Sequence, residues 1–205
     1  MSNKDRNVIV LGVTGGIACG KSAAGRILCE MGFAVCDADH VAHELMKKGA
    51  PVFEQVVDHF GARILMNDGE ISRPLLGEIV FEDPGQRNVL NRLIHPAVRE
   101  ALEQWISEKR RAGRNAAVLI PLLFESGMQD LDWDAILCVS SRIEDVFNRL
   151  EKRGFTRDEA KRRVRSQMPL EEKEMLADQV VPNHGTLKEL ETATRKAVEA
   201  IVGER

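Results

Sequence analysis

The stretch VTGGIACGKSAAG, from Val13 to Gly25, constrains the fold of this 205-residue chain more than any other. Residues 15–22 match the pattern G-x-x-x-x-G-K-[S/T] at every position. An apolar run precedes the motif and a helical pattern follows it, which is the strand–loop–helix context that the motif requires. Glycine lacks a Cβ, so such a loop can curl until its N–H groups converge on a phosphate. The stretch predicts a nucleotide-binding core.

Each position of this phosphate loop has a predicted role. Lys21 would reach the β- and γ-phosphates of a nucleoside triphosphate, and the Ser22 hydroxyl would bind Mg²⁺. The helix that begins near Lys21 would add its positive end to the same anion site. A chance glycine-rich turn would not explain why strand, helix and full spacing occur together. The residues expected to bind the phosphates through the loop are Gly15, Gly16, Ile17, Ala18, Cys19, Gly20, Lys21 and Ser22.

Five short apolar runs predict strands, at residues 7–13, 33–38, 116–124, 135–140 and 178–183. Unbroken runs rich in Val, Ile and Leu are typical of parallel strands that are covered on both faces. Helical patterns separate the runs, the first at residues 21–31. The expected fold class is therefore α/β, with a five-stranded parallel sheet of the P-loop NTPase type in one domain spanning residues 1–205.

The long interval between the second and third runs predicts an inserted helical region at about residues 40–112. Pro51 is expected to be the first residue of one helix, Ser72 to cap a second and Pro96 to open a third. The predicted buried faces are Val52, Val56 and Phe60; Leu75, Leu76, Ile79 and Val80; and Val98, Leu102, Trp105 and Ile106. We expect this region to hold the acceptor substrate.

A second insertion is predicted at about residues 142–175. From Arg149 to Arg165 the chain carries eight Lys or Arg against three acidic residues, although its net charge is −3. A solvated helix face is the ordinary explanation of such a run. Its position between two strands favours instead a mobile helical lid that meets a polyanion.

Composition excludes several other classes. The negative net charge and the 4% of aromatic residues argue against nucleic acid and membrane surfaces as partners. The beginning of the chain does not resemble a signal peptide, and no run approaches membrane-spanning length. We expect a cytoplasmic protein that is a monomer or weak homo-oligomer. The four cysteines show no C-x-x-C pairing and are expected to be reduced thiols: Cys19, Cys29, Cys36 and Cys138.

Acidic side chains follow the second predicted strand, in the segment CDADHVAHELM. Asp37 and Asp39 stand at the carboxyl end of that strand, where ligands of α/β sheets bind, and the strand is expected close to the first. With His40 and His43 they could form a metal site, but the segment offers no third strong ligand. A base that orients a hydroxyl group is the favoured role of Asp39.

With these motifs in hand, the chain resembles the dephospho-coenzyme A kinase family. The family's G-x-T-G-G-I-x-x-G-K-S appears at residues 12–22 and its D-A-D-x-x-A at residues 37–42. Ala18 and Cys19 depart from the more usual Gly and Ser, so Cys19 is either an oxidation site or a small tolerated side chain. The resemblance covers nearly the whole chain in the family's order. Further matches are DGEISRPLLGEIVF (68–81), LIHPAVR (93–99), IPLLFE (120–125), RSQMPLEEK (165–173) and ADQVVPNHG (177–185).

The resemblance implies phosphoryl transfer from ATP to the ribose 3′-hydroxyl of dephospho-coenzyme A, the last step of coenzyme A synthesis, with Mg²⁺ as cofactor. Two alternatives stay open: a related kinase acting on another nucleotide or sugar, and a non-catalytic ATP-binding switch. A guanine-reading N-K-x-D is absent from the sequence, so ATP rather than GTP is the expected donor.

The resemblance also implies site roles. Asp39 would be the base, with Lys21 and the lid cations Arg149, Arg153 and Arg165 neutralising charge on the transferred group. Asn183 would border the adenine, and His95 and Arg99 would face the acceptor, although His95 could equally fix the turn before Pro96. Glu125 is the nearest acid to a Walker-B position, so Mg²⁺ is expected to be held by Ser22, ATP and waters, with Asp39 as a further candidate.

Overall fold

The computed structural model describes residues 8–203 and divides into two compact units. The first unit contains the chain up to Asp37 together with the chain from Ile106 onward, and the second is Ala38–Trp105. The long helix α5 (Pro84–Arg111) contributes to both. The phosphate loop and the sheet belong entirely to the first unit.

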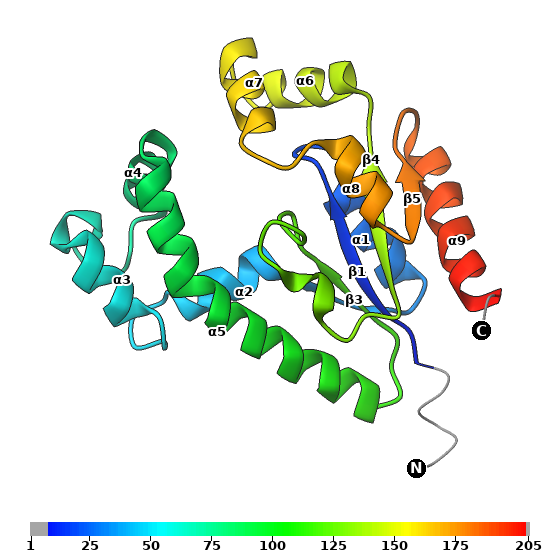
Figure 1. Ribbon diagram of the computed structural model, residues 1–205, viewed down its shortest axis with the longest axis horizontal. Coiled ribbons are helices and arrows are strands. Elements are labelled where there is room, and N and C mark those ends of the chain that lie inside the picture. Colours follow the sequence, from blue (N-terminus) through cyan, green and yellow to red (C-terminus); the bar gives the residue numbers. More distant parts are fainter. Residues whose placement is uncertain (1–7, 204–205) are drawn as a thin grey trace. The chain divides into compact units, whose positions relative to one another are not determined.

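A five-stranded parallel sheet forms the centre of the first unit, in the order β2-β3-β1-β4-β5 (Figure 1). All five predicted runs are strands, although Asn7 lies outside the described residues. β3 stops well before Phe124, because the chain leaves the sheet in a turn at Pro121. The second strand is separated from the first by β3. The strands are β1 (Val10–Gly15), β2 (Ala34–Asp37), β3 (Ala116–Leu119), β4 (Ala135–Ser140) and β5 (Gln179–Pro182).

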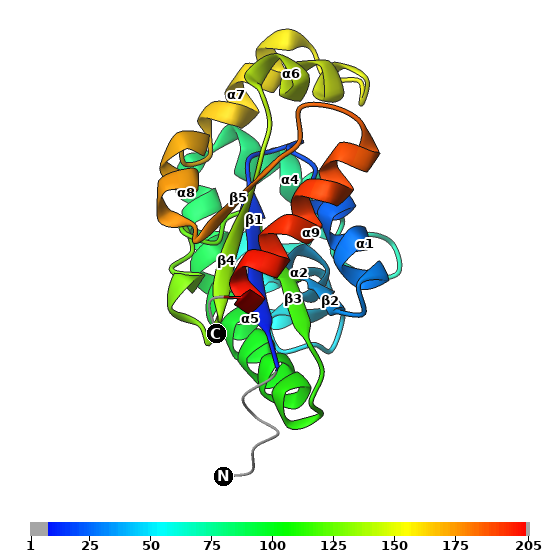
Figure 2. The same cartoon turned by 90° about the vertical axis from the view of Figure 1, so that its right-hand side faces the viewer.

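Helices cover both faces of this sheet (Figure 2). On one face α1 (Lys21–Glu30) packs beside α9 (Leu187–Gly203), and their apolar residues meet alternate residues of the strands. On the other face α8 (Leu170–Leu176) contacts β1 and β4. Between β4 and α8 the chain forms α6 (Ile143–Glu151) and α7 (Arg157–Arg165). A single-turn helix, η3 (Met128–Asp130), follows β3.

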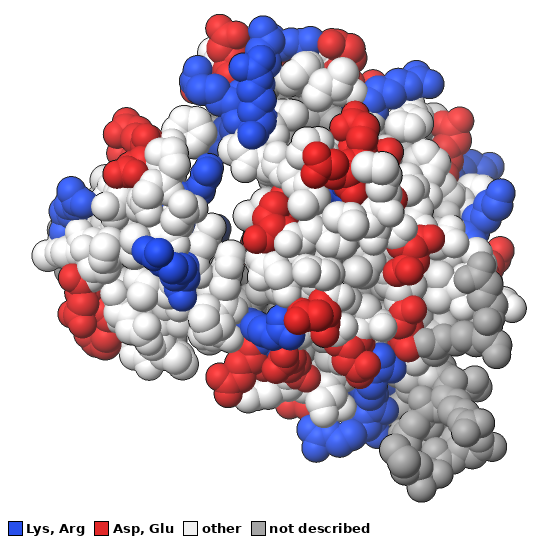
Figure 3. Space-filling view, in the orientation of Figure 1, with Lys and Arg blue, Asp and Glu red and all other residues white. Residues whose placement is uncertain are grey.

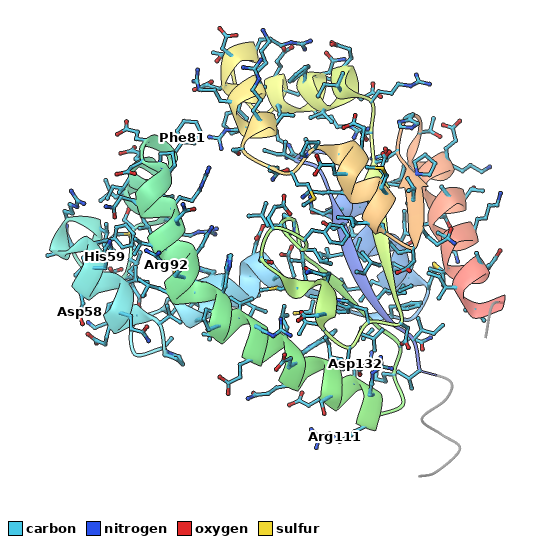
Figure 4. All side chains as sticks on the ribbon, in the orientation of Figure 1. Asp58, His59, Phe81, Arg92, Arg111 and Asp132 are labelled. Atoms are coloured by element: carbon cyan, nitrogen blue, oxygen red, sulfur yellow. The ribbon has the colours of Figure 1, made fainter. Side chains whose placement is uncertain are left out.

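The second unit is helical. It contains α2 (Ala38–Leu45), α3 (Phe53–Phe60), the short η2 (Ala62–Ile64), α4 (Arg73–Glu82) and most of α5. The predicted residues Val52, Val56 and Phe60 are all buried in its core. On α3, the His59 ring lies 3.0 Å from the Gln86 side chain of α5, which ties the two helices together (Figure 4).

Three expectations for these helices need correction. Pro51 lies in a turn, and α3 begins at Phe53. Pro96 does not open a helix but lies inside α5, whose start the sequence signals at Asp83: its carboxylate accepts from the Gly85 and Gln86 amides at 2.7 and 3.2 Å. Leu75 is 41% exposed, and Ile79 and Val80 are half-buried, so Leu76 is the fully buried residue of the predicted α4 face.

Two other expectations are confirmed. Ser72 caps α4 as predicted, accepting from the Leu75 amide. Val98, Leu102 and Ile106 are buried on α5 as predicted, and Trp105 of the same predicted face is half-buried. Within residues 8–203, no helix combines the length and the apolar character needed to cross a membrane.

Candidate active site

The phosphate loop connects β1 to α1, and two of its glycines have a positive φ and a close neighbour where a Cβ would lie. Gly15 has φ +140°, and a Cβ there would clash with the Val139 carbonyl of β4. Gly20, with φ +105°, precedes α1 directly, and its Cβ would clash with the Asn183 side-chain amide. The loop can therefore lie this close to the β4 backbone and to the Asn183 side chain only because both positions lack a Cβ.

Gly20→Ala should weaken ATP binding, and Gly32→Ala provides the matched control. Gly32 has a similar φ of +90°, and a methyl group added there would meet nothing within 4 Å. Both variants should lose about 1–2 kcal/mol of unfolding free energy from backbone strain. Only Gly20→Ala should also displace Asn183 and weaken ATP binding, measured by calorimetric titration. Equal ATP affinity in the two variants would contradict this account of the loop.

Lys21 folds back over the loop that it follows. Its Nζ donates to the Gly15 and Gly16 carbonyl oxygens at 2.8 and 3.0 Å. These acceptors are neutral, whereas a triphosphate offers charged oxygens that form stronger hydrogen bonds. The ammonium is thus held at the loop in a position from which an anion can recruit it.

The Ser22 hydroxyl suits the predicted metal role. Ser22 is exposed in the first turn of α1, directly after Lys21. A hydroxyl oxygen is the kind of hard donor that Mg²⁺ prefers, and the remaining ligands of such an ion are usually phosphate oxygens and waters. The residue present therefore fits Mg²⁺ bound together with a nucleotide.

Arg149, predicted as a lid cation, and Asn183, predicted to border the adenine, both hydrogen-bond to the phosphate loop. The Arg149 guanidinium donates to the Ala18 carbonyl at 3.0 Å, the Ser141 hydroxyl at 2.8 Å and the Asn183 carbonyl at 3.0 Å. The Asn183 amide donates to the Cys19 carbonyl at 2.8 Å. Ser141 donates to the Asn183 carbonyl at 2.7 Å. This cluster fixes the carbonyls at the middle of the loop, where Ala18 has the unusual φ of 56°.

The other two predicted lid cations, Arg153 and Arg165, differ in where they lie. α6 ends at Glu151, so the exposed Arg153 lies in the turn that follows and does not continue the helix from Arg149. Arg165, the last residue of α7, lines a cavity of about 570 Å³ together with Gly16, Ile17 and Cys19 of the loop. Among the predicted lid cations, Arg149 and Arg165 are thus the ones placed at the phosphate loop.

One arginine of the basic run, Arg157, packs and pairs with residues of α6. Lys and Arg side chains gather over α7, at the top of the face seen in Figure 3. Arg157 pairs with Glu144 at 2.6 Å and with Glu151 at 3.3 Å, and its guanidinium lies 4.0 Å from the centre of the Phe147 ring. For Arg157 the ordinary explanation of a charged helix face therefore holds.

Methionine substitutions should separate Arg149 from Arg153. Arg149→Met removes the donor to the Ala18 carbonyl of the loop and to the Asn183 carbonyl. The unfolding free energy should therefore fall by about 1–3 kcal/mol, and kcat should fall by about 10–100-fold. Arg153→Met should change unfolding free energy by less than about 0.5 kcal/mol. Urea unfolding and steady-state kinetics measure both. If Arg149→Met matches the parent in both unfolding free energy and kcat, the role of Arg149 in holding the loop is wrong.

Cys19 is a buried thiol, 1% exposed, on the phosphate loop. Burial raises its pKa above the ordinary value, while the nearby charge of Lys21 lowers it by a smaller amount. A protonated thiol that is almost wholly buried reacts slowly with oxidants. The structure therefore favours a small tolerated side chain over an oxidation site.

The residues expected on the acceptor side belong to the second unit. Asp39 is exposed in the first turn of α2. His95 and Arg99 lie one turn apart on α5, and the Arg99 Nε donates to Glu103 at 2.9 Å. Burial lowers the pKa of His95, which favours the neutral imidazole at neutral pH. The turn proposed as an alternative role for His95 does not exist, since α5 runs through Pro96.

The metal alternative at the second strand has no geometric support. Throughout the part of the chain that the structure describes, no three His, Cys, Asp or Glu side chains group closely enough to hold a metal ion. His40 instead lies 3.9 Å from Glu44, its neighbour on α2.

Three residues that the structure places in or beside the site were not predicted from the sequence: Ser141, Gln167 and Lys173. Ser141 follows β4 and bridges Arg149 to Asn183. Gln167 and Lys173 lie in the matched segment RSQMPLEEK, in which charge and position single out only Arg165. Lys173 is 0% exposed, and nothing in its local sequence distinguishes it from a surface lysine.

A phosphate loop after the central strand of a parallel sheet defines a P-loop nucleotide-binding protein. Comparison with known proteins gives the family. The dephospho-CoA kinase family model matches residues 9–189, and the chain belongs to that family.

Sequence relatives and solved structures support the same family. The chain is 43% identical to the dephospho-CoA kinase of Bacillus cereus over 186 residues, 90% of this chain and 92% of the relative. It is 46% identical to that of Carboxydothermus hydrogenoformans over 181 residues, 87% of each chain. The dephospho-CoA kinase structure from Campylobacter jejuni aligns with a TM-score of 0.69 and 27% identity, covering 95% of this chain and 98% of that one. A shikimate kinase from Acinetobacter baumannii, at 15% identity and a TM-score of 0.56, shares the fold, covering 97% and 96% of the two chains.

Proposed function

We propose that this chain transfers the γ-phosphoryl group of ATP to the ribose 3′-hydroxyl of dephospho-coenzyme A, giving coenzyme A and ADP. The observation that carries the proposal is the family match over residues 9–189, which includes the complete phosphate loop. The expected cytoplasmic location, the monomeric or weakly associated state and the absence of nucleic-acid partners stay predictions.

Different residues of the chain have different roles in the proposed transfer. The 3′-hydroxyl oxygen forms a bond to the γ-phosphorus, and the bond from that phosphorus to the β–γ bridging oxygen breaks, so that ADP leaves with the electron pair. Asp39 aligns the hydroxyl and takes its proton late, because the transition state of such transfers is loose. Lys21 and Arg165 stabilise the charge on the phosphoryl oxygens. Bound Mg²⁺, held through Ser22, would neutralise charge on the same oxygens.

An acceptor panel tests the proposal against its alternatives. ADP release is measured with ATP and, in parallel, dephospho-coenzyme A, AMP, CMP or gluconate. Among these four acceptors, we expect rapid ADP release only with dephospho-coenzyme A. Faster release with one of the other acceptors would favour a related small-molecule kinase. ATP binding without release that depends on any acceptor would favour a non-catalytic switch.

A further inference from the structure

The segment between α7 and α8 is tied to the phosphate loop by a single side chain. The Oε1 atom of Gln167 accepts a hydrogen bond from the Ile17 amide at 2.9 Å. Ile17 is the third residue of the loop, and Gln167 lies 150 residues away along the chain. Gln167 is half-buried and lines the same cavity as Arg165 and the loop.

A second tie holds the same segment from the other side. The Met168 amide donates to Glu125 Oε1 at 3.0 Å, and Glu125 lies within the turn that follows β3. The Lys173 ammonium of α8 donates to Glu125 Oε1 and to the Pro121 carbonyl, each at 2.8 Å. Ile17, Gln167, Met168, Glu125 and Lys173 thus form one connected set, here named the Gln167 brace.

Fold stability alone is a poor explanation of this arrangement. Lys173 is 0% exposed, and removing its charge from water opposes the attraction to Glu125. A buried ion pair is therefore weak support for a fold that an apolar pair would support as well. The brace instead fixes positions. It holds the amide of a phosphate-loop residue, and it fixes the chain two residues after Arg165, the cation that shares the loop's cavity.

We propose that Gln167 is a positioning residue for phosphoryl transfer, held in place by Glu125 and Lys173. The brace sets the orientation of the loop at Ile17 and the distance from the loop to Arg165. Glu125, the acid nearest to a Walker-B position, then serves the brace by anchoring the Met168 amide. This proposal rests on the proposed kinase function, because its effect is expressed in the transfer step.

Gln167→Met removes the acceptor and keeps the size of the side chain. A displaced loop or Arg165 should lower kcat by about 10–100-fold, since small misplacements of reacting groups have effects of that order. KM for dephospho-coenzyme A should stay within about threefold, because the lost interaction acts in the transition state. The thermal midpoint should move by less than about 2 °C. Gln179→Met, the same change at a half-buried site on β5, is the control and should match the parent. A kcat for Gln167→Met within twofold of the control would overturn the proposal.

Two double variants separate the anchor from the ion pair. Each double variant carries Lys173→Met and so lacks the ammonium of the ion pair. In the first, Glu125→Gln removes the negative charge but keeps an oxygen that accepts from the Met168 amide. In the second, Glu125→Met removes both the charge and the oxygen. The first should retain kcat within about threefold of the parent, since an ion pair can be replaced by neutral residues of similar volume. The second should lose kcat as Gln167→Met does. Equal kcat values in the two would overturn the role of Glu125.

Hydrogen exchange tests the brace independently of the acceptor. In the parent the Ile17 amide should exchange slowly, and in Gln167→Met it should exchange at least about tenfold faster, as expected when a protecting hydrogen bond is lost. If the parent does not phosphorylate dephospho-coenzyme A, the proposed function fails while this readout still reports on the brace. Unchanged protection of Ile17 would overturn the brace itself.

Discussion

Lys21→Ala is expected to lower the turnover of ATP by roughly 10³–10⁵-fold, the range found for cations that stabilise a transferring phosphoryl group. In the structure the Lys21 ammonium is held at the loop by two neutral carbonyls. Replacing it removes the one lysine of the phosphate loop, which is predicted to bridge the β- and γ-phosphates. The measurement is the steady-state rate of coenzyme A formation at saturating ATP.

The fold should persist in this variant. Two hydrogen bonds to backbone carbonyls contribute about 0.5–1.5 kcal/mol each, so unfolding free energy should fall only modestly. Lys188→Ala, at an exposed position on α9, is the control for loss of one lysine and should keep the parent's rate. A folded Lys21→Ala variant with an unchanged turnover number would show that the loop does not act on phosphates.

Asp39→Asn is expected to lower kcat by about 10²–10⁴-fold, the usual effect of removing a general base. Asparagine keeps the shape of the side chain but cannot take the proton of the ribose hydroxyl. Binding of both substrates should be largely retained, so KM should change far less than kcat. The exposed position of Asp39 in the first turn of α2 makes the change tolerable for the fold.

Two rival roles of Asp39 predict different results. A carboxylate in the first turn of a helix stabilises that helix through its dipole, and loss of this effect alone would lower stability by about 0.3–1 kcal/mol with normal kcat. A role in holding Mg²⁺ would give a defect that excess metal relieves. Asp58→Asn, an exposed aspartate on α3 (Figure 4), is the control. Turnover by Asp39→Asn within a few-fold of this control would exclude Asp39 as the base.

The strands and the loop could be predicted because their signals are local. Consecutive Val, Ile and Leu residues identify buried parallel strands. The glycines at fixed positions of the motif at residues 15–22 indicate one particular loop conformation. Pro96 misleads the helix prediction for the same reason. A proline opens many helices, but the packing of Val98, Leu102 and Ile106 against the core carries α5 through it.

The partners of the loop could not be predicted, because each is brought to it by tertiary structure. The basic run assigns Arg149 to the lid, yet its guanidinium donates to two carbonyls from distant parts of the chain, those of Ala18 and Asn183. Lys173 is buried by the turn after β3, which supplies Glu125 and the Pro121 carbonyl. Burial and pairing of this kind depend on the assembled sheet and not on neighbouring residues.

The position of the transferred phosphate tests the central claim most directly. The purified parent protein is incubated with ATP, Mg²⁺ and dephospho-coenzyme A, and the product is isolated and examined by ³¹P NMR and mass spectrometry. The account predicts one added phosphoryl group, as a phosphomonoester on the ribose 3′-oxygen, in amounts equal to the ADP formed. ADP formed without this product, or a phosphate found on another hydroxyl group, would contradict it.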